Sequence, residues 1–345
     1  MGQLWELINV DRRQRGLAGG SKLGEFFFED MTAVYRSLQT PCLPDAVDKW
    51  LAQGSVALQP GKIGKLSTEV LDMIFQEILA DDKSEFSINL LSCICFALGC
   101  KWLLTIGKQH ILDGLIRYYV RAANCRLVCL GEYTDVTDQA PPGMLTEDEL
   151  KEIAETKVPA EDDKWAIAER AEDGNDADVI LERCLYNFAM SFYEDAWEAK
   201  RDKFMFSLEW VCMELWARPG AGPQWLLMER GDVVQLRDRS MGEYVREAAL
   251  VALGKEYDRS SLAHAMLSRV CYSLDPSVAD EYCGEEFVGR FGRGPWAGDR
   301  FCIQSEADDM PEPKEGCGFE EWVDVTEEVN RLLENIWRGM HWEDY

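Results

Sequence analysis

The stretch KLSTEVLDMIFQEILADD, residues 65–82, has the most distinctive pattern in the chain. Its large apolar residues recur at helical spacing along two adjoining stripes: Val70, Ile74 and Ile78, and Leu71, Phe75 and Leu79. Ser67 fits the N-cap position, and Leu66 is spaced from Leu71 as in a hydrophobic staple. A surface helix of a globular protein needs only one apolar stripe. The second stripe either packs in a core or docks a partner, and the pattern alone does not separate the two.

The residues that follow extend this helix into a small bundle. INLLSCICFALG, residues 88–99, predicts a second helix that Ser84 or Ser87 caps, and KQHILDGLIRYYVRAA, residues 108–123, predicts a third. The run 88–107 is long enough to suggest a membrane span. Lys101, Asn89 and Ser92 make that costly, so a buried helix is the better interpretation.

Composition limits the classes of partner and compartment. The chain has 345 residues with 63 acidic and 36 basic side chains, a net charge of -27, which repels nucleic-acid phosphates and anionic lipid. Twelve cysteines occur without an N-terminal apolar run of signal-peptide length, which indicates reduced thiols and a cytoplasmic or nuclear protein. We therefore expect neither a nucleic-acid nor a membrane partner.

Strand-like and helical segments outside the bundle predict an α+β fold. LWELINV, CRLVCLGEY, DRFCIQS and EEWVDV read as strands, and three strand-like runs lie within residues 206–238. Helices are expected at DMTAVYRSL, PDAVDKWLAQG, 240–253, 261–274 and behind Thr326. The expected architecture is an N-terminal helical bundle followed by a mixed body with antiparallel strands.

Charge and composition divide the chain into four regions. Residues 1–60 form an N-terminal extension that packs on the C-terminal body or stands apart from it, and 61–120 form the helical segment. Residues 121–182 contain a strand and an acidic stretch expected to be mobile, although Thr146 and Glu149 form a capping box within it. Residues 183–345 form the α+β body.

The segment from Lys65 to His110 resembles an F-box. Leu66, Glu69-Val70-Leu71 and Ile74-Phe75 match that family's first helix, and Cys100-Lys101-Trp102 match its later Cys-(Lys/Arg)-aromatic signature; Ser67 stands where the family usually has Pro. The resemblance implies docking to a Skp1-type adaptor of a cullin-RING ubiquitin ligase. The partner-binding residues it implies are Leu66, Ser67, Val70, Leu71, Ile74, Phe75, Ile78, Leu79, Leu90, Leu91 and Leu98.

A second resemblance covers most of the chain. MGQLWELINVDRR, GGSKLGEFFF, EYVREAAL, LSRVCYSLDPS and RGPWAGDRF look like blocks shared by a family of uncharacterised proteins from mushroom-forming fungi. Many members of that family carry an F-box-like segment. No activity comes with this resemblance.

Sites for metal or nucleophilic chemistry are poorly represented. The cysteines lack a Cys-x2-Cys pair and only three histidines occur, so no metal or other cofactor is expected. His264 beside Ser261 and Ser268 is a set of helix neighbours more than a catalytic pair, and Gly-x-Ser-x-Gly is absent.

The most distinctive loop is GRFGRGPWAGDRF, residues 289–301. Arg290, Arg293 and Arg300 concentrate positive charge around Trp296, a potential stacking platform, and four glycines free the backbone to approach a ligand. The alternative is a structural turn whose arginines pair with nearby acids and whose tryptophan fills the core.

The favoured interpretation is a non-catalytic, F-box-like substrate adaptor. Its helical segment docks the Skp1-type subunit, its body presents an unidentified client protein, and the loop at 289–301 contributes to client or ligand recognition. The first alternative is an interaction or ligand-sensing protein whose helices are ordinary core. An enzyme that uses the Gly/Arg-rich loop is the second.

Overall fold

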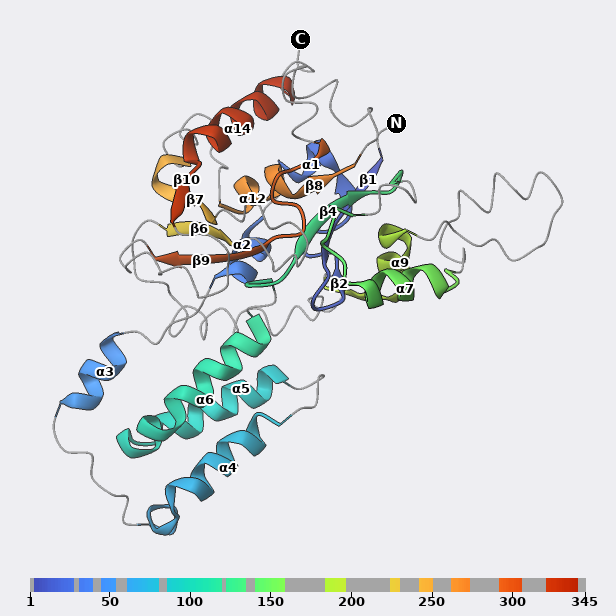
Figure 1. Ribbon diagram of the computed structural model, residues 1–345. Helices are drawn as coiled ribbons and strands as arrows, with labels where there is room; N and C mark the ends of the chain where they lie inside the picture. Colours follow the sequence, from blue (N-terminus) through green and yellow to red (C-terminus); the bar gives the residue numbers. More distant parts are fainter. Residues whose placement is uncertain are drawn as a thin grey trace.

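The computed structural model (Figure 1) describes residues 3–27, 31–39, 45–53, 61–80, 86–119, 122–134, 140–158, 184–196, 224–229, 242–250, 262–273, 292–305 and 321–340.

The first strand of the chain lies in the middle of the main sheet. Within the described residues this sheet has the order β5-β2-β1-β4-β8, with β3 also paired to β1. Its strands are β1 Leu4–Asn9, β2 Gln14–Arg15, β3 Ser21–Lys22, β4 Leu127–Gly131, β5 Glu194–Asp195 and β8 Cys271–Tyr272. β1 and β4 run antiparallel, with Trp5 opposite Gly131 and Asn9 opposite Leu127. The strands expected at LWELINV and CRLVCLGEY are confirmed.

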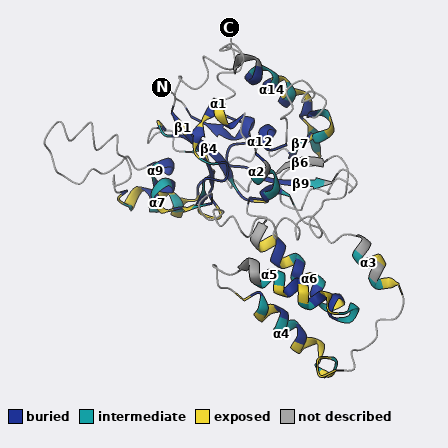
Figure 2. Ribbon diagram, turned by 180° about the vertical axis from the view of Figure 1, so that it is seen from behind, coloured by how far each residue is buried: buried dark blue, intermediate teal, exposed yellow. Residues whose placement is uncertain are grey.

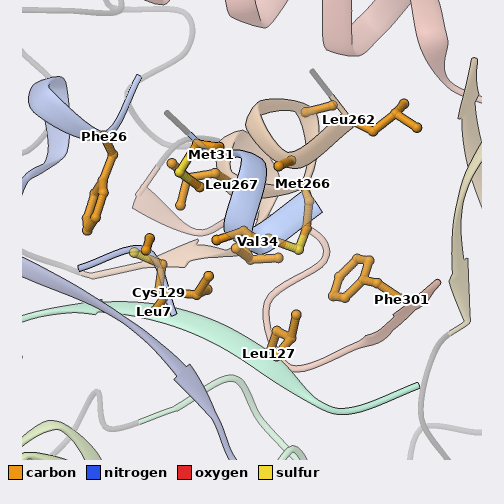
Figure 3. Packing of buried hydrophobic residues seen from close by; sticks show 14 of the residues in the cluster. Leu7, Phe26, Met31, Val34, Leu127, Cys129, Leu262, Met266, Leu267 and Phe301 are labelled. Atoms are coloured by element: carbon orange, nitrogen blue, oxygen red, sulfur yellow. The ribbon is translucent and has the colours of Figure 1, made fainter. Parts of the chain in front are cut away.

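Helices cover both faces of this sheet, as the alternation of side chains along β1 requires. Trp5 and Leu7 point into one core, which they share with α1 Leu23–Phe26, α2 Thr32–Leu38 and α12 Leu262–Val270. Figure 3 shows this core, with Leu7 and Cys129 of the sheet beneath Met31 and Leu267. Ile8 points to the opposite face, which α7 Glu147–Glu155 and α9 Leu185–Phe192 cover.

A second sheet packs on the same core. Its order is β10-β7-β6-β9, and the strands are β6 Gln224–Glu229, β7 Gly242–Arg246, β9 Arg300–Ser305 and β10 Trp322–Asp324. β6 pairs antiparallel with β7 and β9, whereas β10 pairs parallel with β7. Phe301 and Ile303 of β9 reach the core, and the last helix, α14 Thr326–Met340, adds Leu333 and Ile336. The fold is α+β.

The remaining helices form a group with a core of their own. They are α3 Asp45–Ala52, a 3-10 turn Ile63–Lys65, α4 Thr68–Ile78, α5 Phe86–Leu98 and α6 Lys101–Tyr119. α4, α5 and α6 contact one another, and Phe75, Leu90 and Ile111 are among the side chains they bury. We call this group, residues 45–119, the helical insert; it stands apart from the two sheets in Figure 1.

The chain leaves the body and returns to it at one point. The backbone N–H groups of Ala122 and Ala123 donate to the carbonyl of Ser37, at 3.1 and 3.0 Å. Residues 4–39 thus belong to the body, and the helices are inserted between α2 and β4. The expected order, a helical bundle first and the body after it, is not confirmed. Strands from both sides of the helices pair with each other, β1 with β4 and β2 with β5, so the N-terminal residues pack on the C-terminal body.

Tertiary pairing also overrides one predicted helix. The segment 240–253 was expected to be helical throughout, but Gly242–Arg246 is strand β7, held between β6 and β10. Val245 is fully buried there. A helix in this segment can therefore begin only after Arg246. Ser240, the predicted N-cap, lies outside the described residues.

Part of the acidic region packs on the body. Thr146 and Glu149 form the expected capping box at the start of α7, and Ile153 is buried. Arg126 holds the helix to the body, with Nη2 2.8 Å from Glu149 and 2.7 Å from Asp11. Met144 and Leu145, just before α7, are also buried in the core on this face of the main sheet. Residues 135–139 and 159–183 lie outside the described part.

Candidate functional site

The inner stripe of α4 is core. Leu71 and Phe75 are fully buried and Leu79 is nearly so, and Phe75 and Leu79 belong to the core of the helical insert. The Phe75 ring stacks on His110 of α6, with centroids 5.3 Å apart and planes 8° from parallel. His110 Nε2 lies 3.0 Å from Asp72 Oδ1, so the imidazole joins the two helices through both its face and its edge.

The other stripe remains partly open. Val70 is 40% exposed and Met73 is 66% exposed, while Ile74 is intermediate. These three residues, at i, i+3 and i+4, form what we call the outer face of α4. Ile78, one turn beyond Ile74, packs partly on the core of the insert. Figure 2 colours the ribbon of α4 by burial and shows buried, intermediate and exposed residues along it. Among the described residues, α4 therefore leaves an apolar face only partly covered.

The start of α4 differs from a simple Ser cap. Ser67 occupies the N-cap position with extended backbone, but its side chain accepts no hydrogen bond from the helix. It hydrogen-bonds the Glu69 carboxylate instead, which lowers the pKa of Glu69. Ser67 is exposed and Leu66 is half-buried, at the N-terminal end of α4.

The next helix, α5, contributes both buried and exposed residues to the predicted partner-binding set. Leu90 is buried in the core, Leu91 is half-buried against it, and Leu98 at the helix end is 53% exposed. Four of the eleven residues assigned to partner binding are therefore core residues in this structure: Leu71, Phe75, Leu79 and Leu90.

Sequence reasoning missed three exposed apolar residues of the insert. Met73, Ile63 and Ile116 are all exposed. Met73 follows Val70 by three positions, a spacing that was available in the sequence. Ile63 and Ile116 had no such signal, because their exposure depends on how the helices pack.

The Cys100-Lys101-Trp102 signature lies where α6 begins. Cys100 Sγ accepts from the backbone N–H of Leu103 at 3.5 Å, in the manner of a cap, and Lys101 Nζ donates to the carbonyl of Gln53 at 2.5 Å. Lys108 of the same helix pairs with Asp48 at 2.6 Å. These lysines hold α3 against α6. The apolar run 88–107 is divided into α5 and α6 at this point, and within the described ranges every helix is too short or too polar to span a bilayer.

The loop at 289–301 was expected to recognise a client. Its described part, residues 292–301, packs into the core. Trp296 is fully buried; its Nε1 donates to Glu243 Oε2 at 2.6 Å, and the Arg269 guanidinium lies 4.6 Å from its ring centroid. Arg269 also pairs with Glu243 and Glu328, each at 3.0 Å. Trp296 thus fills the core, which agrees with the second of the two interpretations of this loop, and its ring packs against residues of β7 and α12 instead of being open to a ligand.

The arginines of this loop have separate environments. Arg300 Nη1 pairs with Asp11 at 2.5 Å and donates to the carbonyl of Asn124, so it joins β9 to the main sheet. Arg293 is exposed, with its guanidinium 5.5 Å from the ring centroid of Tyr272. Arg290 lies outside the described residues. The structure thus does not gather Arg293, Trp296 and Arg300 into one exposed site.

A glycine explains why the loop sits so close to its neighbours. A Cβ on Gly294 would lie 2.1 Å from the carbonyl oxygen of Arg269, so no other residue fits without moving that backbone. The glycine that suggested a ligand-binding loop therefore serves contact with the chain itself.

Metal and nucleophile chemistry gain no support from the described residues. Among them, no three His, Cys, Asp or Glu side chains converge as a metal site requires. Burial raises the pKa of the Cys93 thiol to about 12, which leaves it a neutral core residue. The Ser268 hydroxyl donates to the carbonyl of Ala265 at 2.8 Å rather than to His264. Ser261 and His341 lie outside the described residues.

Comparison with known proteins adds no relative. No family model matches the chain, and no curated protein or solved structure is significantly similar to it.

Proposed function

We propose that the chain is a non-catalytic adaptor whose helical insert docks a Skp1-type subunit of a cullin-RING ubiquitin ligase. The proposal rests on the resemblance of residues 65–110 to an F-box. The observation that supports it is the division of α4 into a core stripe and the partly exposed outer face, Val70, Met73 and Ile74. Five of the nine exposed large apolar residues in the described part belong to the insert: Ile63, Val70, Met73, Leu98 and Ile116.

The exposed apolar residues of the insert can contribute part of the energy of a specific contact. Fully burying a large aliphatic side chain contributes about 1.5–3 kcal/mol, and Val70 and Met73, which are 40% and 66% exposed, would each contribute a fraction of this toward the about 8 kcal/mol of a micromolar interaction. The core stripe would act indirectly by keeping the outer face in place. In this proposal the client binds to the body, at a surface that remains to be found by experiment.

The direct test is co-purification of the full chain with a recombinant Skp1-type adaptor and a cullin scaffold. The wild-type chain should form a complex. The double variant Val70→Glu/Met73→Glu should bind at least about tenfold more weakly, since it places two charges in the contact. Both positions are exposed, so the melting temperature should change little.

Leu150→Glu is the matched control. Leu150 is also an exposed apolar residue on a helix, but it lies on α7 of the body. It should bind the adaptor like wild type. If the wild-type chain fails to bind while an established F-box protein binds the same preparation, the proposal is wrong, and an interaction protein with an ordinary helical core becomes the better description.

A further inference from the structure

One position of β1 breaks the apolar pattern of its face. Ile8 and Val10 on that face enter the core under α7 and α9, yet Glu6 shares their side of the strand and is only 3% exposed. A carboxyl group in such a place needs partners or must stay neutral. Glu6 Oε1 has no hydrogen-bond partner.

A glycine-containing loop closes over this carboxyl. Residues 16–20, which we call the strap, connect β2 to β3, and both strands pair with β1. A Cβ on Gly16 would lie 3.4 Å from Glu6 Oε1, and a Cβ on Gly20 would lie 2.8 Å from Glu6 Oε2. The strap therefore touches the carboxyl at both ends. Between those ends it buries Leu17 and Ala18 in the main core.

A second carboxylate lies beside Glu6 at the same end of the strap. Asp195 Oδ1 would be 2.9 Å from a Cβ on Gly16, and Asp195 pairs with Arg15 at 3.1 Å. Because Arg15 is engaged with Asp195, it compensates only part of the charge that an ionised Glu6 would bring.

Among the residues that the structure describes, the other titratable groups near Glu6 offer no positive charge. Tyr186 of α9, Glu132 after β4 and Cys129 of β4 interact electrostatically with this cluster. Each is neutral or negative. Arg15 on β2 and Asp195 on β5 complete the set of charged groups around the carboxyl.

The pKa of Glu6 is raised from 4.5 to about 7, and burial is the largest cause. Arg15 and a hydrogen bond from the Gly16 backbone lower this pKa, and the neighbouring Asp195 raises it. When the strap opens, water reaches the carboxyl and its pKa returns toward 4.5. The open state thus holds fewer protons than the closed state between these two values. By linkage, rising pH in that interval favours opening, and above pH 7 the effect levels off.

We propose that opening of the strap is coupled to proton release from Glu6, so that Leu17 and Ala18 become more accessible as the pH rises from acidic to neutral. Protonated Glu6 fits between Gly16 and Gly20 without a buried charge. Ionised Glu6 draws water in and loosens the contact. The coupling is independent of any partner of the helical insert.

Hydrogen exchange of the full chain, corrected for the intrinsic pH dependence of exchange, tests this directly. Protection of the amides of residues 17–21 should fall more than about tenfold between pH 5 and pH 8. The amides of α4 report on the insert in the same sample and should show no such loss. In Glu6→Gln the side chain cannot ionise, and protection of the strap should be the same at both pH values.

A second variant keeps the test decisive if Glu6→Gln does not fold. Asp195→Asn removes the neighbouring negative charge, so the loss of strap protection should be smaller and should end at a lower pH than in wild type. Strap protection that is independent of pH in the wild-type chain would overturn the proposal. So would an unchanged pH dependence in Glu6→Gln.

Discussion

Single glycines decide how closely the helices of the insert approach. A Cβ on Gly107 would lie 2.4 Å from Phe75 Cζ and 3.0 Å from the Cβ of Ala97, so α6 receives the Phe75 ring against its own backbone. Gly114, seven residues later on the same helix, allows a similar approach of Leu90. In the sequence these glycines read as weak points of a helix. Their role in close helix packing becomes clear only from the position of the Phe75 side chain in the structure.

Replacing Gly107 by Ala should destabilise the helical insert. The methyl group must displace the Phe75 ring, and overpacking of this kind costs about 1–3 kcal/mol, which outweighs the gain of up to about 1 kcal/mol in helix propensity. Urea unfolding of the full chain, followed by the exchange of α4 amides, would measure the loss. Gly61→Ala is the control, since nothing lies within 4 Å of a Cβ at that position. Equal stability of the two variants would contradict the packing described for Phe75.

Glu6 should make the body less stable as the pH rises. Its pKa in the folded chain, about 7, is above the unfolded value of 4.5, so its stabilising contribution is complete below pH 4.5 and is lost by about pH 7. The difference corresponds to about 3 kcal/mol at most. Denaturant unfolding at pH 5 and pH 7.5 should show a smaller pH dependence in Glu6→Gln than in wild type. The comparison between the two chains cancels the general repulsion that a net charge of -27 produces.

At the scale of elements, the sequence predicted what local pattern determines. The strand at Arg300–Ser305, the capping box of α7 and the helix behind Thr326 are confirmed. β7 was missed because its residues have helical spacing, and only its pairing with β6 and β10 makes it a strand. The docking of α7 was missed for a similar reason, since Arg126 meets Glu149 across 23 residues. The candidate site was predictable only in part. The sequence predicted α4 and its two apolar stripes, but it did not show which of the two stripes is exposed.

The loop around Trp296 should behave as a structural element. Trp296→Ala removes a fully buried ring and leaves Glu243 and Arg269 without one of their contacts, which should cost about 3–5 kcal/mol of stability. Arg293→Ala, in the same loop but exposed, should cost less than about 0.5 kcal/mol. Thermal melts of the two variants would measure this. If both melt like wild type, the loop does not hold α12, β7 and α14 together.

At the scale of the whole molecule, the chain forms its body from two separated segments. β1 and α2 come before the helical insert, while β4 and the second sheet come after it. No local pattern could show that residues 4–9 pair with residues 127–131, because strand pairing depends on partners far away in the chain. The hydrogen bonds from Ala122 and Ala123 to Ser37 close the body across the insertion point. The insert therefore adds its own core without interrupting that of the body.

This arrangement predicts that the body folds without the helices. Replacing residues 40–121 by a flexible linker of about four residues should leave a folded protein, since the two ends already meet at Ser37 and Ala122 and closing a shorter loop costs less entropy. Circular dichroism and a cooperative thermal melt would report the fold, and strap exchange at pH 5 and pH 8 would report whether Glu6 keeps its environment. The same protein should no longer bind the Skp1-type adaptor. Removing residues 1–30 is the control, and it should prevent folding of the body because β1 is its central strand. A linker variant that cannot fold, beside a truncated chain that can, would mean that the helices rather than β1 hold the body together.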